Sequence, residues 1–293
     1  MLDKSKTVIA LGYFDSVHTG HRKVILEALK LAKSQNATLT VFSFNGELKG
    51  RFSDSRGYVY SPRERKQIFD SLGVDQVFFA PVTKSYLDKS KLAFLSDINS
   101  RLDICAYVCG SDYTFGKNAS GNISFLKEYA KKLGQQVVCI ELKAIGGEKV
   151  STTKIKTLLG EGNIREANEL LGSKYFITST VIRGRGMGKK LQFPTANLVI
   201  DSNKCQLKEG VYSGEAIVDG TKYKAVINYG NCPTFNENKK ILEAHILGLD
   251  CDVYGKEITV FFTRFLRNVV KFDSAEDLQN QIRKDIRESE KDG

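Results

Sequence analysis

The sequence predicts two domains: an α/β domain built on a doubly wound parallel sheet, then a mainly β domain forming a small antiparallel barrel with a terminal helix. Strand and helix patterns alternate through the first half, which is typical of a parallel sheet. Strand patterns dominate from Tyr175 onward, which favours an antiparallel barrel. The length of 293 residues fits about two domains of roughly 150 residues each. We expect domains over 1–172 and 173–293, with the boundary near 172–178.

The first half opens with a buried strand over 7–14, followed by a helix over 21–36 whose apolar residues recur on one face. Ser61, Pro62 and Glu64 combine an N-cap, a first-turn proline and an acid at the third position. This combination predicts a helix that begins at Ser61 and runs to about Leu72. Further strands are expected at 39–44, 75–80, 105–109 and 136–142, and further helices at 91–101 and 124–133.

The second half starts after two short helices within 151–171, which Gly160 and Gly162 separate. Asp219-Gly220 lies between two alternating runs and indicates a hairpin turn. Ser274, with an acid three residues later, predicts the start of the terminal helix. Its expected apolar side consists of Leu278, Ile282 and Ile286. Strands are expected at 175–183, 211–218, 222–229, 241–249 and 256–265.

The composition is that of a globular protein, with 41% hydrophobic and 27% charged residues, so disordered and collagen-like classes are excluded. No apolar run approaches the roughly 18 residues that a membrane-spanning helix needs. The first residues also lack the layout of a secretory signal. We therefore expect a cytoplasmic protein with no membrane partner. The six cysteines form no C-x-x-C unit, so free thiols are expected rather than a zinc site.

The net charge is +10, from 44 Lys and Arg against 34 Asp and Glu. A basic protein attracts polyanions, which include nucleic acids, phosphorylated small molecules and acidic membrane surfaces. Charge alone does not choose among these ligands, and a basic surface without any specific ligand fits it equally well.

Two of the three histidines, His18 and His21, follow the first predicted strand and open the first helix. Ligands bind at this place in open α/β sheets, and helix-start N–H groups there favour phosphate. Two imidazoles can stabilise charge that develops on phosphorus. Capping or surface histidines are the alternative interpretation. The preceding residues Gly12, Phe14 and Asp15 favour a phosphate-handling site.

The second half carries two further patterns. A glycine-rich basic loop spans Gly184–Lys190 and precedes Phe193-Pro194-Thr195-Ala196-Asn197. Glycines let the backbone approach phosphate and lysines neutralise it, although the loop lacks the spacing of the common P-loop and a simple hairpin loop is also possible. Glu243 and His245 alternate along a strand and therefore share one face. A solvated glutamate is the alternative for Glu243.

Taken together, these patterns resemble known enzymes. The run G-x-F-D-x-x-H-x-G-H resembles the signature of HxGH nucleotidyltransferases. The whole chain resembles the prokaryotic bifunctional riboflavin kinase/FMN adenylyltransferase (FAD synthetase) family. The matching segments are the helix start at Ser61, Gly110–Gly116, Val150–Lys156, Phe193–Asn197, Asn228–Phe235 and Glu243–His245. The resemblance implies a Rossmann-like first domain and a riboflavin-kinase barrel.

The resemblance also implies two ATP-dependent reactions on small-molecule substrates, with no nucleic-acid partner. It does not indicate the number of subunits. The second domain would phosphorylate riboflavin to FMN, with Glu243 as general base. Mg²⁺ would be bound by Thr195, with Asn197 beside it. The first domain would then join FMN to AMP from ATP, forming FAD and pyrophosphate, with His18 and His21 stabilising the reacting phosphate.

The resemblance assigns further residues to substrate and nucleotide binding in both domains. In the first domain they are Gly12, Phe14, Asp15, Asp112, Tyr113, Phe115, Thr152, Thr153 and Lys156. In the second they are Gly184, Gly188, Lys189, Thr195, Asn197 and Arg267.

The sequence departs from the family pattern at a few positions. Ser16 stands where a glycine is common, and Thr19 replaces a usual leucine. Lys156 replaces an arginine, so a two-pronged phosphate contact becomes a point charge. The segment Phe44-Asn45-Gly46 lacks a usual Pro/His run, and Gln192 replaces a glycine. Ser16 and Lys156 keep open an alternative, a riboflavin kinase with weak or absent adenylyltransferase activity.

Two other classes compete with this hypothesis. A nucleic-acid-binding or flavin-storing protein would use the basic face and would turn over no ATP, and its nucleic-acid affinity would depend strongly on salt. A cytidylyltransferase of the same superfamily would explain the histidine motif but neither the P-T-A-N segment nor Glu243.

Overall fold

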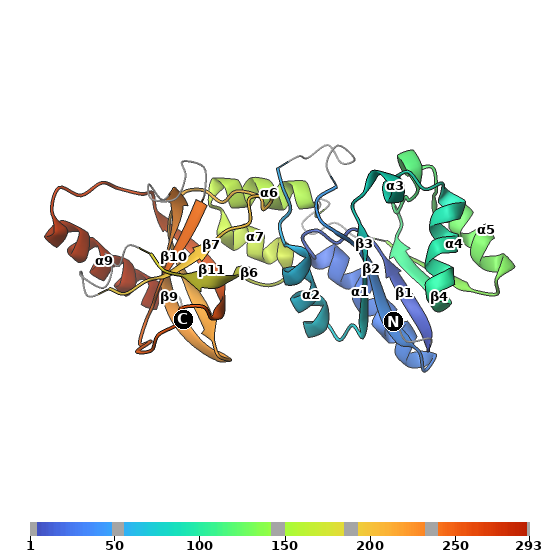
Figure 1. The fold of residues 1–293 in the computed structure, drawn as a ribbon, viewed down its shortest axis with the longest axis horizontal. Coiled ribbons are helices and arrows are strands. Elements are labelled where there is room, and N and C mark those ends of the chain that lie inside the picture. Colours follow the sequence, from blue (N-terminus) through green and yellow to red (C-terminus); the bar gives the residue numbers. More distant parts are fainter. Residues whose placement is uncertain (1–4, 49–55, 142–149, 185–192, 232–239, 292–293) are drawn as a thin grey trace. The chain divides into compact units, whose positions relative to one another are not determined.

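The computed structural model describes residues 5–48, 56–141, 150–184, 193–231 and 240–291. The chain divides into two compact units, Met1–Thr152 and Thr153–Gly293. The first is an α/β unit and the second contains a β-barrel, which confirms the predicted fold class (Figure 1).

The first unit is built on a five-stranded parallel sheet in the order β3-β2-β1-β4-β5. Its strands are β1 (Lys6–Leu11), β2 (Thr38–Asn45), β3 (Gln76–Pro81), β4 (Asp103–Gly110) and β5 (Gln136–Ile140). The strand order reverses direction beside β1, so the loops after β1 and β4 border the crevice where ligands bind in such sheets. Leu11 pairs with Cys109, so these two strands end almost level with each other.

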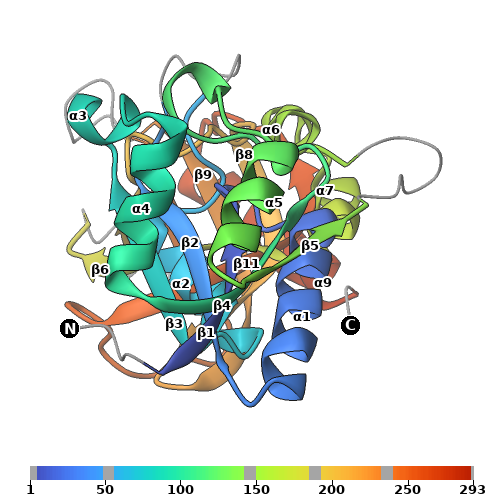
Figure 2. The ribbon, with the colours of Figure 1, turned by 90° about the vertical axis from the view of Figure 1, so that its right-hand side faces the viewer.

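Helices cover both faces of this sheet (Figure 2). They are α1 (Thr19–Ser34), α2 (Pro62–Ser71), the short α3 (Lys84–Leu87), α4 (Lys91–Arg101) and α5 (Ile123–Lys132). Ile9 and Leu11 pack with residues of α4 and α5 in one buried cluster. Val8 and Ala10 alternate with them and point to the opposite face.

The second unit contains a closed barrel in the order β10-β7-β6-β11-β8-β9, with every pair antiparallel. Its strands are β6 (Tyr175–Ile182), β7 (Ala196–Val199), β8 (Gly210–Val218), β9 (Thr221–Asn231), β10 (Lys240–Ile246) and β11 (Glu257–Arg267). Its helices are α6 (Thr152–Glu161), α7 (Ile164–Leu171) and α9 (Ala275–Glu290). Helix α7 contacts β6 and β11, whereas α9 contacts β8 and β9.

Several local predictions are confirmed. Ser61 and Glu64 form a reciprocal capping box at the start of α2. Asp219 and Gly220 have φ angles of 48° and 80° and connect β8 to β9, as the hairpin requires. The Ser274 side chain accepts a hydrogen bond from the Asp277 N–H and caps α9.

The domain boundary expected near 172–178 stays a prediction, because the division into compact units does not test it. The compact units divide after Thr152, and α7 packs on the barrel. Its Asn168 donates to the Phe262 carbonyl and accepts from the Tyr175 N–H, which joins the helix to two strands. The four-residue strand β7 was not expected, since Pro194 and Thr195 lead into it and it is too short to alternate clearly.

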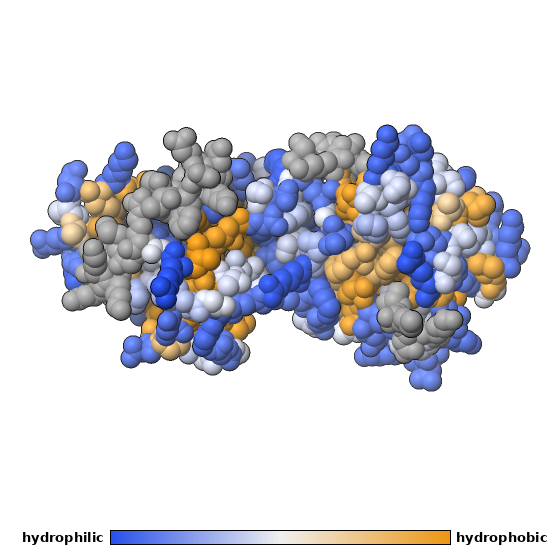
Figure 3. All heavy atoms as spheres, viewed as in Figure 1, coloured by the Kyte–Doolittle hydropathy of each residue, from blue (hydrophilic) through white to orange (hydrophobic). Residues whose placement is uncertain are grey.

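The surface is mainly hydrophilic on the face shown in Figure 3, with hydrophobic groups between charged residues on both units. The exposed large hydrophobic residues of the described segments are Leu26, Leu92, Leu133, Val199, Tyr254, Val269 and Val270. Among the helices in those segments, none combines the length and apolarity needed to cross a membrane.

Candidate active sites

The segment between β1 and α1 has an unusual backbone. Phe14 and Val17 have φ angles of 51° and 41°, a region that L-residues rarely adopt and that is most costly for a β-branched side chain. A Cβ atom on Gly12 would lie 2.6 Å from the Phe14 ring, so glycine is needed for the ring to pack there. Such strain persists only where surrounding contacts enforce it, and it clusters at functional sites.

Buried polar contacts enforce this conformation. The Asp15 carboxylate is 2% exposed and accepts a hydrogen bond of 2.8 Å from the Val59 N–H. The Tyr13 carbonyl accepts from Ser43 Oγ at 2.6 Å and from Arg65 at 3.0 Å. Arg65 also donates to the Phe44 carbonyl, so this fully buried guanidinium joins the loop after β1 to the end of β2.

The two histidines of this segment lie face to face. His18 is the N-cap of α1, and its Nδ1 accepts a hydrogen bond of 3.2 Å from the His21 N–H. The two imidazole rings stack with centroids 3.7 Å apart and planes 12° apart. The Phe14 ring packs edge-on against His21. Burial, and secondly the neighbouring His18, hold the pKa of His21 well below its usual value. His21 is therefore neutral near pH 7, and its ring N–H can act as a hydrogen-bond donor.

This low pKa predicts a pH-dependent stability. The unfolded chain binds a proton on His21 near its usual pKa of about 6.5, whereas the folded protein does not. Stability therefore falls as the pH is lowered below about 6.5, with a slope of at most about 1.4 kcal/mol per pH unit for this one proton. Urea unfolding of the protein and of His21→Asn across this range measures the slope. An equal slope in both proteins would contradict the prediction.

A hydroxyl pair links this segment to the start of α6. Ser16 is fully buried, and its Oγ lies 2.9 Å from Thr152 Oγ1. The serine that departs from the family pattern is therefore hydrogen-bonded to a residue expected to hold phosphate. Thr153 and Lys156 follow on α6, where Lys156 is buried.

The segment after β4 combines an exposed acid with packed aromatic rings. Asp112 is exposed, whereas Tyr113 stacks on Phe115 with centroids 5.7 Å apart. Phe115 belongs to the buried cluster and packs against Phe94 of α4. Burial raises the pKa of Tyr113 well above its usual value, so its hydroxyl stays protonated. Phe115 thus anchors the segment in the hydrophobic core, while Asp112 is exposed at the surface.

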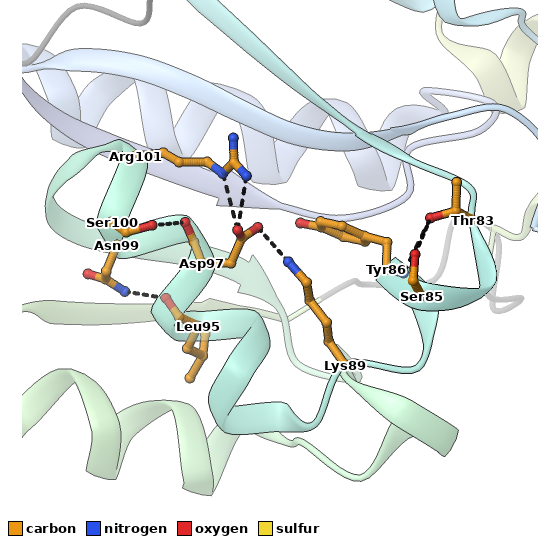
Figure 4. A network of polar contacts seen from close by, with 9 residues as sticks. All are labelled: Thr83, Ser85, Tyr86, Lys89, Leu95, Asp97, Asn99, Ser100 and Arg101. Carbon is orange, nitrogen blue, oxygen red and sulfur yellow. Dashed lines mark hydrogen bonds and ion pairs between the residues drawn. The ribbon is translucent and has the colours of Figure 1, made fainter.

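An ionic network steadies the neighbouring α3–α4 region, and it was not expected from the sequence (Figure 4). Arg101 and Lys89 both reach the Asp97 carboxylate at 3.1 Å. Partial burial acts to raise the pKa of Asp97, but these two cations hold it below its usual value. The Lys89 carbonyl accepts from the Lys117 N–H at 2.8 Å, which connects the network to the segment after β4.

The barrel brings three polar residues into one row. Glu243 of β10 pairs with Asn197 of β7 on one side and with Asn228 of β9 on the other. Asn228 Nδ2 donates to Glu243 Oε2 at 3.3 Å. Asn197 is buried, and its Nδ2 makes a long hydrogen bond of 3.4 Å to the Thr195 carbonyl. Asn228 opens the family-like segment Asn228–Phe235, but the sequence pattern indicates no role for its side chain.

Gly184 packs directly against this row. A Cβ atom there would lie 2.5 Å from Asn197 Nδ2. We expect Gly184→Ala to displace the Asn197 amide and to lower the activity that depends on this row by roughly tenfold or more, since misplaced positioning groups cost up to about 10²-fold. Gly160→Ala is the matched control, because a Cβ there meets nothing closer than 3.8 Å. Steady-state rates of both variants test this, and equal activity would contradict it.

Arg267, which the resemblance assigns to substrate or nucleotide binding, lies at the end of β11. Its guanidinium forms a two-pronged ion pair with Asp285, with bonds of 2.7 to 3.1 Å. Asp285 is 4% exposed and also accepts from Gln281. Arg267 therefore ties α9 to the end of β11. The expected binding residues Gly188 and Lys189 lie outside the described residues.

The two units define a class of protein, an enzyme that joins a Rossmann-like nucleotidyltransferase fold to a kinase barrel. Family models match both parts in chain order: FAD synthetase over residues 1–154 and riboflavin kinase over residues 171–292. With the whole-chain relatives described next, these matches show that the chain belongs to the bifunctional riboflavin kinase/FMN adenylyltransferase family.

Curated relatives of that name cover almost the whole chain. The Bacillus subtilis protein is 30% identical, over 98% of this chain and 92% of its own length. The Listeria monocytogenes protein is 32% identical over 95% and 90%, and the Escherichia coli protein is 28% identical over 95% and 90%. A crystal structure described as a macrolide-efflux protein from Streptococcus pneumoniae covers 99% of this chain and 95% of its own, with a TM-score of 0.86 and 26% identity.

Proposed function

We propose that the two activities of this enzyme use separate sites, one in each unit. The barrel site phosphorylates the 5′-hydroxyl of riboflavin, and the site after β1 joins the resulting FMN to AMP. The observation that carries this proposal is that the two sets of polar groups belong to different compact units. The stacked His18 and His21 belong to the parallel-sheet unit, and the row around Glu243 belongs to the barrel.

In the barrel, Glu243 accepts the proton of the riboflavin hydroxyl while the hydroxyl oxygen bonds to the γ-phosphorus of ATP and ADP leaves. A primary alcohol is a weak nucleophile near pH 7, so a positioned base contributes about 10²–10⁴-fold. The hydrogen bond from Asn228 holds one oxygen of Glu243 and directs the carboxylate. Asn197 lies opposite, on the other neighbouring strand.

The residues beside this carboxylate fit Mg²⁺. The Thr195 hydroxyl and the Asn197 amide carbonyl are hard oxygen donors, which Mg²⁺ prefers, and it commonly takes one or two protein ligands together with substrate phosphates. Donation from Asn197 Nδ2 to the Thr195 carbonyl orients that amide. When bound, Mg²⁺ neutralises charge on the phosphates of ATP. We assign its binding to Thr195 and Asn197.

In the first unit, an FMN phosphate oxygen bonds to the α-phosphorus of ATP, and pyrophosphate leaves. The phosphate is already anionic and needs no strong base, so alignment and charge stabilisation provide the catalysis. The neutral His21 ring donates a hydrogen bond to the reacting phosphate, and His18 holds the His21 backbone at the helix start. Thr152, whose Oγ1 lies 2.9 Å from Ser16 Oγ, is assigned to the leaving phosphates.

The net positive charge of the protein fits the binding of anionic substrates. Every substrate except riboflavin is an anion, so the net charge of +10 favours their approach. We propose that the enzyme works in the cytoplasm on small molecules, without a nucleic-acid or membrane partner.

The test is a time course with riboflavin, ATP and Mg²⁺, in which riboflavin, FMN and FAD are separated by chromatography. The proposal expects FMN first and FAD after it, with pyrophosphate released in step with FAD. FMN alone would favour the alternative of a kinase with weak adenylyltransferase activity, which the serine at position 16 and Lys156 motivate. Formation of neither product would overturn the proposal.

A further inference from the structure

The pairing of β7 with β10 stops just before Thr195, one of the residues expected to bind Mg²⁺. Its last backbone pair is Ala196 with Ala244. Pro194 lies beyond that pair and has no N–H with which to continue the ladder. At this point a side chain of β10 makes the contact: His245 Nδ1 lies 2.8 Å from the Pro194 carbonyl oxygen.

The contact fixes the direction of the hydrogen bond. A carbonyl oxygen only accepts, so Nδ1 of His245 must carry the hydrogen and donate it. The ring is also held by Phe193, which packs edge-on against it with centroids 5.5 Å apart and planes 84° apart. The imidazole is therefore placed by a directed hydrogen bond and by an aromatic contact, both made with the segment that precedes β7.

Side-chain donors thus hold the backbone carbonyl groups before and after the Cα atom of Thr195, which directly precedes β7. His245 binds the Pro194 carbonyl, and Asn197 binds the Thr195 carbonyl. Glu243 lies two residues before His245 on the same face of β10. Strand β10 therefore presents the general base Glu243 and also fixes the backbone of Thr195, whose hydroxyl is assigned to magnesium binding.

We propose that His245 is a positioning residue for the phosphorylation of riboflavin, holding Thr195 in register with Glu243 through the Pro194 carbonyl. The proposal rests on the function given above to Thr195 and Glu243. It assigns His245 no proton transfer. The imidazole acts through one hydrogen bond, from Nδ1 to the Pro194 carbonyl. A residue that only fills space would not need a donor at this position.

Two substitutions separate the donor from the bulk of the ring. Asn places its Nδ2 about where the imidazole has Nδ1, whereas Gln places its amide nitrogen nearer the position of Nε2. We expect His245→Asn to keep the kinase kcat within about threefold and His245→Gln to lower it by about 10- to 100-fold, as misplaced positioning groups do. Conversion of FMN to FAD by the same chains is the internal control and stays unchanged in both. Equal kinase losses in both variants would overturn the proposal.

A second readout does not depend on turnover. Calorimetric titration with ADP and Mg²⁺ should give a weaker affinity in His245→Gln than in His245→Asn, while thermal unfolding of the two variants remains similar. Equal affinities in the two variants would overturn the proposal. If the unmodified enzyme formed no FMN, the proposed function itself would fail. The position of the hydrogen on the His245 ring would still test the contact with Pro194, because its measurement needs no turnover.

The tautomer can be observed directly. Because the sequence has three histidines, imidazole nitrogen NMR spectra at about pH 8 resolve each ring. The signals that disappear in His245→Asn identify His245. We expect a hydrogen on Nδ1 and none on Nε2. A hydrogen on Nε2 alone would overturn the proposal.

Discussion

Glu243→Gln is expected to abolish phosphorylation of riboflavin while conversion of FMN to FAD continues at its normal rate. Glutamine keeps the shape of the side chain but cannot accept the hydroxyl proton. The expected loss is about 10²–10⁴-fold, the contribution of a general base. Initial rates with riboflavin and, separately, with FMN measure the two steps in one protein.

Glu215→Gln provides a matched control for this substitution. Glu215 is a carboxylate of the same barrel, on β8, and it pairs with Lys174 and Lys222 at the surface. Such exposed pairs contribute little, so both activities should persist. Loss of FAD formation from FMN in Glu243→Gln would contradict separate sites, and retention of its kinase activity would remove Glu243 from the mechanism.

His21→Ala is expected to give the opposite pattern. Removing the ring N–H takes away a donor to the reacting phosphate, and loss of one such donor costs about 10²–10³-fold in kcat. Formation of FMN from riboflavin by the same chain should remain unchanged, because the barrel contains none of the removed contacts. Rates with FMN and ATP, followed by chromatography, measure the loss.

The interpretation of this variant needs a check on folding, because His21 packs against His18 and Phe14. Nδ1 of His21 is buried, so Nε2 is the nitrogen that can reach a phosphate. His21→Gln places its amide nitrogen nearer that position and should recover part of the adenylyltransferase activity. Full FAD synthesis by His21→Ala would exclude His21 from the site. Simultaneous loss of FMN formation would indicate a general folding defect.

Local sequence signals predicted most of the fold. The Ser61 capping box and the Asp219-Gly220 turn each involve residues close in the chain, so their patterns can be seen without the structure. The packing of α7 on the barrel could not be found in this way. It includes the hydrogen bond from Asn168 to the Phe262 carbonyl, a contact between residues 94 positions apart.

The same distinction applies to the candidate sites. The histidine segment and Glu243 lie in recognisable sequence patterns. The residues that hold these sites in place do not lie in such patterns. Arg65 binds the Tyr13 carbonyl across 52 positions, and His245 binds the Pro194 carbonyl across 51. Arg267 carried a family assignment, but its partner Asp285 becomes evident only when α9 folds onto the barrel. Long-range hydrogen bonds leave no periodic signal in a single sequence.

The independence of the two sites can be measured by mixing Glu243→Gln with His21→Ala in the presence of riboflavin, ATP and Mg²⁺. Alone, His21→Ala should accumulate FMN, and Glu243→Gln should leave riboflavin unchanged. Together they should form FAD, because FMN released by one protein is a substrate for the other. If FMN accumulates in the mixture and no FAD appears, although Glu243→Gln converts added FMN when alone, the two sites do not act separately.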